Sequence, residues 1–218
     1  MTWDPFGTIA DTLWLGGGQW AGKSTVARIL ARRCGITAYH YDYHDARGHD
    51  ARRVADRAAR GEPLTGPGPD EVWVRRTSAE MARDALEEFG RRFEWTLDDL
   101  RGLVSGRPIL AEGWGLRPEL VAPLLDSPGR MLVMVPTEEF RQRQLRELPR
   151  AREFGPRVSD PERAQANRVD RDRLLAVSAA EAAREHGIRV LAVDGSRDAE
   201  QVADEVADHF SPYLANLS

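Results

Sequence analysis

The feature that most constrains this chain is a glycine-rich loop that separates a short apolar run from a helical pattern. Thr12 to Leu15 predicts a buried strand, Gly16 to Thr25 supplies the loop, and Val26 to Ala31 has helical periodicity. Glycines let the backbone turn through conformations that other residues rarely adopt. The order of strand, glycine loop and helix therefore predicts an α/β fold with the loop at the carboxyl end of a strand.

The loop matches the pattern G-x-x-x-x-G-K-[ST]. In this pattern backbone N–H groups curl around a phosphate, and the positive end of the following helix dipole faces it. Lys23 is expected at the β- and γ-phosphates, Ser24 on a magnesium ion and Thr25 at an α-phosphate. The predicted nucleotide-binding residues of the loop are Gly17, Gly18, Gln19, Trp20, Ala21, Gly22, Lys23, Ser24 and Thr25.

Lys23 is the only lysine among 31 basic residues, so the chain otherwise uses arginine for positive charge. A compact ammonium on a flexible stem that reaches phosphate oxygens explains this exception. The guanine-binding pattern of switch GTPases, Asn-Lys-x-Asp, requires a second lysine and is therefore excluded. The expected ligands are ATP and Mg²⁺.

Length and composition limit the remaining possibilities. The chain has 218 residues, a net charge of -4 and a hydrophobic fraction of 41%, which predicts one globular domain. No apolar run approaches the roughly 20 residues of a membrane helix. The first residues do not resemble a secretory signal, and the single cysteine, Cys34, suits a reducing compartment. We therefore expect a cytoplasmic protein, a monomer or homodimer, without nucleic-acid or membrane partners.

The rest of the chain alternates between strand and helix patterns. Further strands are predicted at 36–41, 108–113, 130–135 and 189–193. Helices are predicted at 47–60, 78–93, 96–104, 161–185 and 199–210, with a loop at 61–70. Thr96 is expected to cap the helix that it begins, and Asp160 precedes the long helix at 161–185. This alternation predicts a parallel sheet that is covered on both faces, with its active site at the carboxyl ends of the strands.

The glycine loop, Asp42 after the second strand, an arginine-rich segment after the fourth strand and Asp194-Gly195-Ser196 before the last helix together resemble the P-loop kinase family. The resemblance covers nearly the whole chain. It is greatest to small members, such as nucleoside monophosphate, shikimate, gluconate and chloramphenicol kinases and zeta-toxin sugar kinases. It implies a three-layer P-loop NTPase fold with a five-stranded parallel sheet. A single domain, 1–218, would include a helical substrate-binding lobe at 46–106 and an arginine-rich lid region at 138–172.

Five arginines lie between Arg141 and Arg152, where relatives close a lid over ATP. Arginines there can stabilise charge on the transferred phosphoryl group while the lid excludes water. The resemblance assigns catalytic roles to Arg146 and Arg150, and a nucleotide contact to Arg143. For each of these three arginines, a position on a solvated helix face is an equally consistent explanation. Arg171 resembles a second phosphate-contacting arginine, or it pairs with an acidic neighbour on its own helix.

Two carboxylates follow strands near the loop. Asp42 is predicted to be the catalytic base or an anchor for the acceptor hydroxyl, although a turn-capping aspartate is the alternative. His40, His44 and Asp45 crowd the same strand end; we expect the histidines to form hydrogen bonds, and no histidine or cysteine spacing is typical of zinc.

Glu112 ends the third strand, where many P-loop proteins have an aspartate. Three roles are open for it: binding Mg²⁺ through water, contacting the substrate, or satisfying backbone donors at the turn. Trp114 is a candidate to stack on a substrate ring, and Arg75 to bind an anionic acceptor, although both residues also suit structural roles. Asp194, Gly195 and Ser196 resemble the loop that lies against adenine, or they form a plain strand-to-helix turn.

Together these residues predict an ATP-dependent phosphotransferase that transfers the γ-phosphate to a hydroxyl or phosphate of a small molecule such as a nucleoside, nucleotide, sugar or antibiotic. Two alternatives remain: an ATPase that couples hydrolysis to a protein partner, and a protein that binds nucleotide without kinase activity.

Overall fold

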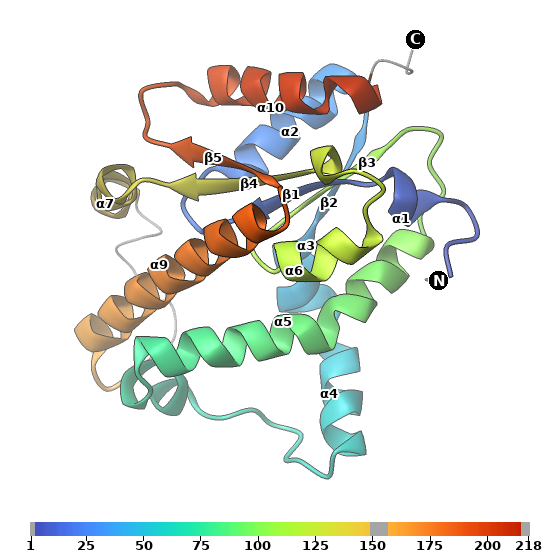
Figure 1. Ribbon diagram of the computed structural model, residues 1–218. Helices are drawn as coiled ribbons and strands as arrows, with labels where there is room; N and C mark the ends of the chain where they lie inside the picture. The colour runs from blue at the N-terminus through green and yellow to red at the C-terminus, as the bar shows by residue number, and fades with distance from the viewer. Residues whose placement is uncertain (1–2, 149–156, 215–218) are drawn as a thin grey trace.

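The computed structural model describes residues 3–148 and 157–214 and consists of one sheet with helices around it (Figure 1). The strands are β1 (Leu13–Gly17), β2 (Thr37–His40), β3 (Ile109–Glu112), β4 (Met131–Pro136) and β5 (Arg189–Val193). The α-helices are α1 (Thr8–Asp11), α2 (Lys23–Cys34), α3 (Tyr41–Tyr43), α4 (Asp50–Ala59), α5 (Ser78–Arg101), α6 (Pro118–Val121), α7 (Glu138–Glu147), α9 (Pro161–Glu185) and α10 (Ala199–Leu214). Two π-helical turns, η1 (His44–Gly48) and η2 (Glu71–Arg75), and two 3₁₀ turns, η3 (Ala122–Leu124) and η4 (Pro128–Arg130), complete the described elements.

The five strands are parallel and lie in the order β2-β3-β1-β4-β5, which confirms the predicted five-stranded parallel sheet. Strand β1 is central, with β3 on one side and β4 on the other. The register pairs Glu112 with Leu15 on β1 and with His40 on β2. Because parallel strands end at the same edge, the segments after β1, β2 and β3 meet there.

Helices cover both faces of the sheet, so the fold has the three predicted layers. Helices α2 and α10 cover one face, and α9, α5 and α6 cover the other (Figure 1). Side chains alternate between the faces along β1: Leu13 and Leu15 join the core under α2 and α10, whereas Trp14 joins the core under α5 and α9. Both cores have buried aliphatic and aromatic side chains from strands and helices, which fixes β1 in the interior.

The segment 46–106 is mostly helical, but its helices differ from those predicted. One helix, α5, spans the two predicted at 78–93 and 96–104, and Thr96 lies fully buried in its interior. The cap is instead Thr77, whose hydroxyl accepts from the N–H of Glu80 while the Glu80 carboxylate accepts from the N–H of Thr77. These two reciprocal hydrogen bonds cap α5 one turn before Met81, the first buried side chain of the helix.

Several boundaries agree with the sequence patterns. Helix α9 begins at Pro161 behind Asp160, whose side chain accepts from the N–H of Arg163, and β5 has the predicted bounds. The predicted helix at 47–60 is divided: the π-helical turn η1 precedes α4. A π-turn places residues five apart on one side, a spacing that helical periodicity does not reveal.

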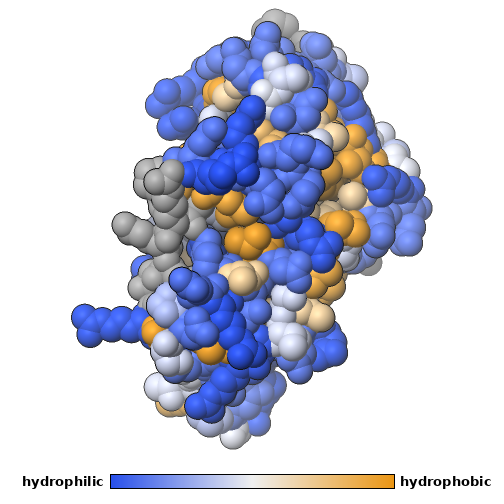
Figure 2. Space-filling model, turned by 90° about the vertical axis from the view of Figure 1, so that its left-hand side faces the viewer, coloured by the Kyte–Doolittle hydropathy of each residue, from blue (hydrophilic) through white to orange (hydrophobic). Residues whose placement is uncertain are grey.

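The outer surface is dominated by polar side chains. On the face shown in Figure 2, hydrophilic residues predominate and hydrophobic residues are visible between them near the centre. Among residues 3–148 and 157–214, no helix combines the length and the apolar character needed to cross a bilayer.

Candidate functional site

The glycine loop joins the central strand to α2 at the carboxyl edge of the sheet. Gly17 has a φ of 117°, and a Cβ atom there would lie 2.1 Å from the carbonyl oxygen of Met134 on β4. Gly22, at the N-cap of α2, has a φ of 83°. Both positions therefore require glycine, which lets the loop pass close to β4 and turn into the helix. Trp20 is the one described non-glycine residue with a positive φ, at 70°.

Lys23 occupies the first turn of α2 with its ammonium group buried inside the loop. Its Nζ donates to the carbonyl oxygens of Gly18 at 2.7 Å and Gly17 at 3.3 Å. Burial lowers the pKa of Lys23, and the nearby carboxylates of Asp42, Glu112 and Asp172 oppose this shift. A positive charge thus lies in a backbone cradle where phosphate oxygens can replace the two carbonyls.

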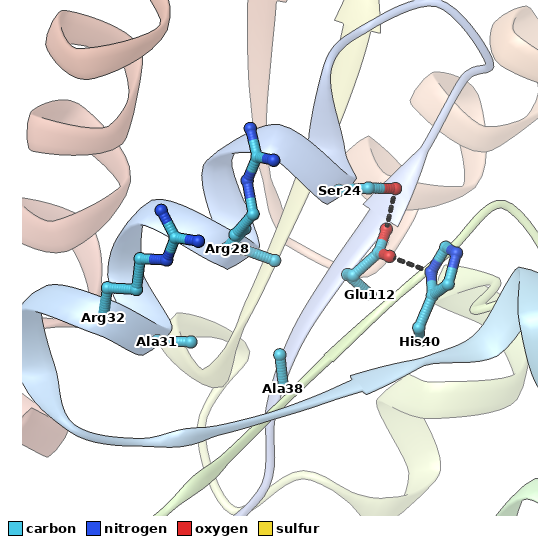
Figure 3. A pocket seen from close by; sticks show the side chains of 8 residues that line it. Ser24, Arg28, Ala31, Arg32, Ala38, His40 and Glu112 are labelled. Carbon is cyan, nitrogen blue, oxygen red and sulfur yellow. Dashed lines mark hydrogen bonds and ion pairs between the residues drawn. The ribbon is translucent and has the colours of Figure 1, made fainter.

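Ser24 lies beside a buried carboxylate (Figure 3). Its hydroxyl donates to Glu112 Oε2 at 3.1 Å, and His40 Nδ1 bonds to the other carboxylate oxygen. Burial raises the pKa of Glu112, while His40 and Lys23 lower it. The partners of Glu112 in the described structure are thus side chains, and the prediction that it satisfies backbone donors finds no support there.

The oxygen atoms of Ser24 and Glu112 fit a hard cation. Magnesium prefers hydroxyl, carboxylate and water oxygens, and it is usually held by few protein groups together with phosphates. One side of Glu112 also opens to a cavity of about 400 Å³ that includes Arg28 and Arg32 of α2 (Figure 3). The Ser24 hydroxyl and the Glu112 carboxylate would therefore suit Mg²⁺ beside a bound phosphate.

Asp42 lies in α3, directly after β2, and accepts from the backbone N–H of Trp114 at 3.3 Å. Gly113 permits this approach, since a Cβ atom there would lie 2.9 Å from Asp42 Oδ1 and 2.5 Å from the Tyr41 Cβ. A cavity of about 270 Å³ joins this carboxylate to the glycine loop. The residues that line it are Gln19, Trp20, Gly22, Lys23, Ser24, Thr25, His40 and Asp42. The structure thus brings the predicted base to the predicted phosphate site.

Arg171 on α9 lies between two aromatic rings. Its guanidinium carbon is 5.0 Å from the ring centroid of Trp114 and 5.0 Å from that of Trp73. It also donates twice to Asp172, from Nε at 3.0 Å and from Nη2 at 2.5 Å. The ion pair that the sequence offered as an alternative is therefore present. Trp114 contacts Phe89 as well, with centroids 4.9 Å apart.

Asp172 connects this group to the glycine loop. The indole N–H of Trp20 donates to Asp172 Oδ2 at 3.2 Å, and the carboxylate is 4% exposed. A second cavity, of about 310 Å³, is lined by Gln19, Trp20, Arg168, Arg171 and Asp172. Sequence reasoning gave no site role to Asp172 or Arg168, which face the loop four residues apart on α9. Their spacing of four residues is typical of an ion pair on a helix, but it does not place that pair at the loop.

The predicted lid and adenine-loop residues meet at one point. Arg143 on α7 donates to the carbonyl of Gly195 at 3.2 Å and lies 5.0 Å from the ring of Phe140. The Asp194 carboxylate accepts from the N–H and the hydroxyl of Ser196, so it shapes the turn. The structure thus brings Arg143 and this turn together, a contact that the sequence did not predict.

The remaining predicted residues lie apart from these cavities. Arg146 is on the exposed side of α7, and Arg150 lies outside the described residues. Arg75 is exposed at the end of η2. Trp73, two residues earlier, is the member of that turn that contacts Arg171.

Comparisons with known proteins found similarity only among solved structures. No protein-family model matches the chain, and no curated protein matches it. It is similar to a gluconokinase from Sinorhizobium meliloti 1021, with 16% identity, a TM-score of 0.44 and 96% of each chain covered. A shikimate kinase from Acinetobacter baumannii in complex with shikimate has 15% identity, a TM-score of 0.43 and the same coverage. A shikimate kinase from Aquifex aeolicus vf5 has 15% identity and a TM-score of 0.37, with 93% of this chain and 97% of that chain covered.

Proposed function

We propose that the protein is an ATP-dependent kinase that transfers the γ-phosphate of ATP to a hydroxyl or phosphate of a small molecule. The observation that carries this proposal is the cavity of about 270 Å³ that Lys23 and Ser24 share with Asp42. A phosphate loop alone can serve any nucleotide-binding protein. A carboxylate that faces the same cavity adds a proton acceptor where a second substrate would meet the phosphate.

At the phosphate end, backbone N–H groups at the start of α2 and the Lys23 ammonium bind the nucleotide's phosphates. Lys23 exchanges the carbonyl oxygens of Gly17 and Gly18 for phosphate oxygens, so its charge is already in place before the nucleotide arrives. Ser24, and Glu112 through water, would hold Mg²⁺, which neutralises charge on the phosphates when it is bound.

At the acceptor end, Asp42 orients the accepting hydroxyl and takes its proton. The bond from the N–H of Trp114 fixes the Asp42 carboxylate against the turn at Gly113. Arg171, held between Trp73 and Trp114, supplies positive charge on the other side of the loop. It can stabilise charge on the oxygens of the transferred group.

The far end of the nucleotide would lie by Arg143 and the Asp194–Ser196 turn. Arg143 bonds to Gly195, and backbone groups of this turn are suited to the edge of an adenine ring. Arg146, on α7, is proposed to contact the phosphates, and Arg150, which lies outside the described residues, keeps the same predicted role.

The test is consumption of ATP, with GTP in parallel, across a panel of nucleosides, nucleotides, sugars and hydroxylated antibiotics, with products identified by mass. Gain of one phosphoryl group by an acceptor is the expected result. Lys23→Ala should lower this transfer by at least about 10²-fold. Asp42→Asn should lower kcat by about 10²- to 10⁴-fold with little change in ATP affinity.

Asp50→Asn is the matched control, since Asp50 is an exposed carboxylate on α4 and pairs with Arg53. Its activity should equal that of the wild type. Transfer that survives in both Lys23→Ala and Asp42→Asn would contradict the mechanism. Hydrolysis that rises only with a protein partner, with no acceptor phosphorylated, would instead support a partner-coupled ATPase.

A further inference from the structure

A cluster of metal-ligand side chains lies at the base of the helical lobe, apart from the glycine loop. Two of its members, His44 and His49, are five residues apart, and the N–H of His49 donates to the carbonyl of His44 at 2.9 Å. That bond is the i to i+5 bond of a π-turn, which stacks both side chains on one side of η1. Such turns occur mostly as single insertions, frequently at functional sites. Helical or strand periodicity does not predict this pairing.

The third member comes from another element. Asp99 on α5 has its Oδ2 atom 2.7 Å from His49 Nε2 and 3.3 Å from His44 Nδ1. One ligand atom from each residue lies within 4.8 Å of the others. Ligand atoms around a tetrahedral zinc ion are about 3.3 Å apart, given Zn–N distances of about 2.0–2.1 Å. The three side chains thus require only small adjustments to share an ion.

Neighbouring side chains keep these three residues oriented. The hydroxyl of Tyr39 donates to Asp99 Oδ2 at 2.8 Å, and the Tyr39 ring stacks on His44 with centroids 4.4 Å apart. One group opposes a cation: an Arg52 guanidinium nitrogen is 3.7 Å from the other oxygen of Asp99.

We propose that His44, His49 and Asp99 form a Zn²⁺ site, with water as the remaining ligand. Two imidazoles and one carboxylate are a donor set that zinc accepts, whereas Mg²⁺ prefers oxygen ligands alone. Tyr39 acts as an outer partner that orients the carboxylate. The ion joins η1 to α5, and η1 directly follows the α3 turn that carries Asp42. Zinc therefore fixes the base of the lobe, and its binding does not depend on the proposed kinase activity.

The experiment is titration of the full, chelator-treated chain with Zn²⁺ by calorimetry, followed by Co²⁺ as a spectroscopic probe of coordination. We expect one tight site per chain and a tetrahedral-type visible spectrum with Co²⁺. His44→Gln and His49→Gln should each weaken Zn²⁺ binding by at least about tenfold. Because His49 is buried and its replacement can impair folding, the half-exposed His44 is the primary variant.

His186→Gln is the matched control, since His186 is exposed at the end of α9 and should leave binding unchanged. Glu112→Gln separates the two candidate ion sites: it removes the carboxylate beside Ser24 and His40, and the lobe site should keep its affinity. Absence of a tight site in the wild type overturns the proposal, and so does binding that is unchanged in His44→Gln. Loss of binding in Glu112→Gln would assign the ion to the other site. None of these results depends on whether ATP is consumed.

Discussion

Replacement of Asp172 by asparagine tests the connection between the glycine loop and α9. The buried carboxylate accepts from Trp20 Nε1 at 3.2 Å and twice from Arg171, at 3.0 and 2.5 Å. Loss of one partner from a buried ion pair costs about 3–5 kcal/mol. Asparagine keeps an acceptor oxygen, so we expect a loss of about 2–3 kcal/mol, in the range of hydrogen bonds to charged groups. For a domain of this size, Tm should fall by about 4–12 °C.

The assay is urea unfolding, with the free energy of unfolding taken at an unchanged m value. The control is Asp170→Asn on the same helix, because Asp170 pairs with Arg173 where both side chains are 44% exposed. Asp170 also accepts from the Ser78 hydroxyl, and asparagine can still accept this bond. Exposed pairs are worth about 1 kcal/mol or less. If Asp172→Asn costs no more than Asp170→Asn, the contact between Trp20 and α9 is not stabilising, and this reasoning is refuted.

Three further substitutions, one of them a control, test the turn at Gly113 and the carboxylate beside the loop. Gly113→Ala should destabilise the fold by about 1–3 kcal/mol, because its Cβ would lie 2.5 Å from the Tyr41 Cβ. The control, Gly90→Ala, places a Cβ in open space on α5 and should stabilise the fold by about 0.5–1 kcal/mol. Urea unfolding measures both changes. Burial raises the pKa of Glu112 above its ordinary 4.5. Between the unfolded and the folded pKa, the folded state therefore binds more protons than the unfolded chain. The free energy of unfolding should thus fall as pH rises through that range. Glu112→Gln should remove this fall in Mg²⁺-free unfolding measured from pH 4 to 8, and an unchanged pH slope would contradict the assignment.

Strands β3, β4 and β5 could be predicted from the sequence because they are short, largely apolar runs with glycine or proline near their ends. Helix α9 could be predicted as well, since Asp160 and Pro161 are local start signals. The prediction that a second helix begins at Thr96 was wrong because of tertiary packing. A threonine before acidic residues is typical of a cap, but its side chain is fully buried against the core, so α5 continues through it.

The site was predictable to the extent that its residues follow strands. Lys23, Ser24, Asp42 and Glu112 all lie at the carboxyl edge, and parallel topology alone brings them together. Asp172 was not predictable, because its partner Trp20 is 152 residues away in sequence. The neighbouring residues on α9 predicted an ion pair of Arg171 with an acidic side chain. The position of that pair depends on how α9 packs against the glycine loop, which the sequence does not show.

The charges around Lys23 are arranged for a ligand rather than for the stability of the free protein. Burial disfavours the charged forms of both Lys23 and Glu112, and the carboxylates of Asp42 and Asp172 lie near the same ammonium. A buried charged group that binds phosphate has lost its hydration. This loss lowers the free energy of unfolding, whereas a buried apolar residue at the same position would not lower it. The proposed nucleotide and its cation would place negative charge near Lys23 and positive charge near Glu112, so their binding would offset that cost. The sole lysine of the chain thus occupies the position where a compact, buried cation is most useful to a phosphate-binding loop.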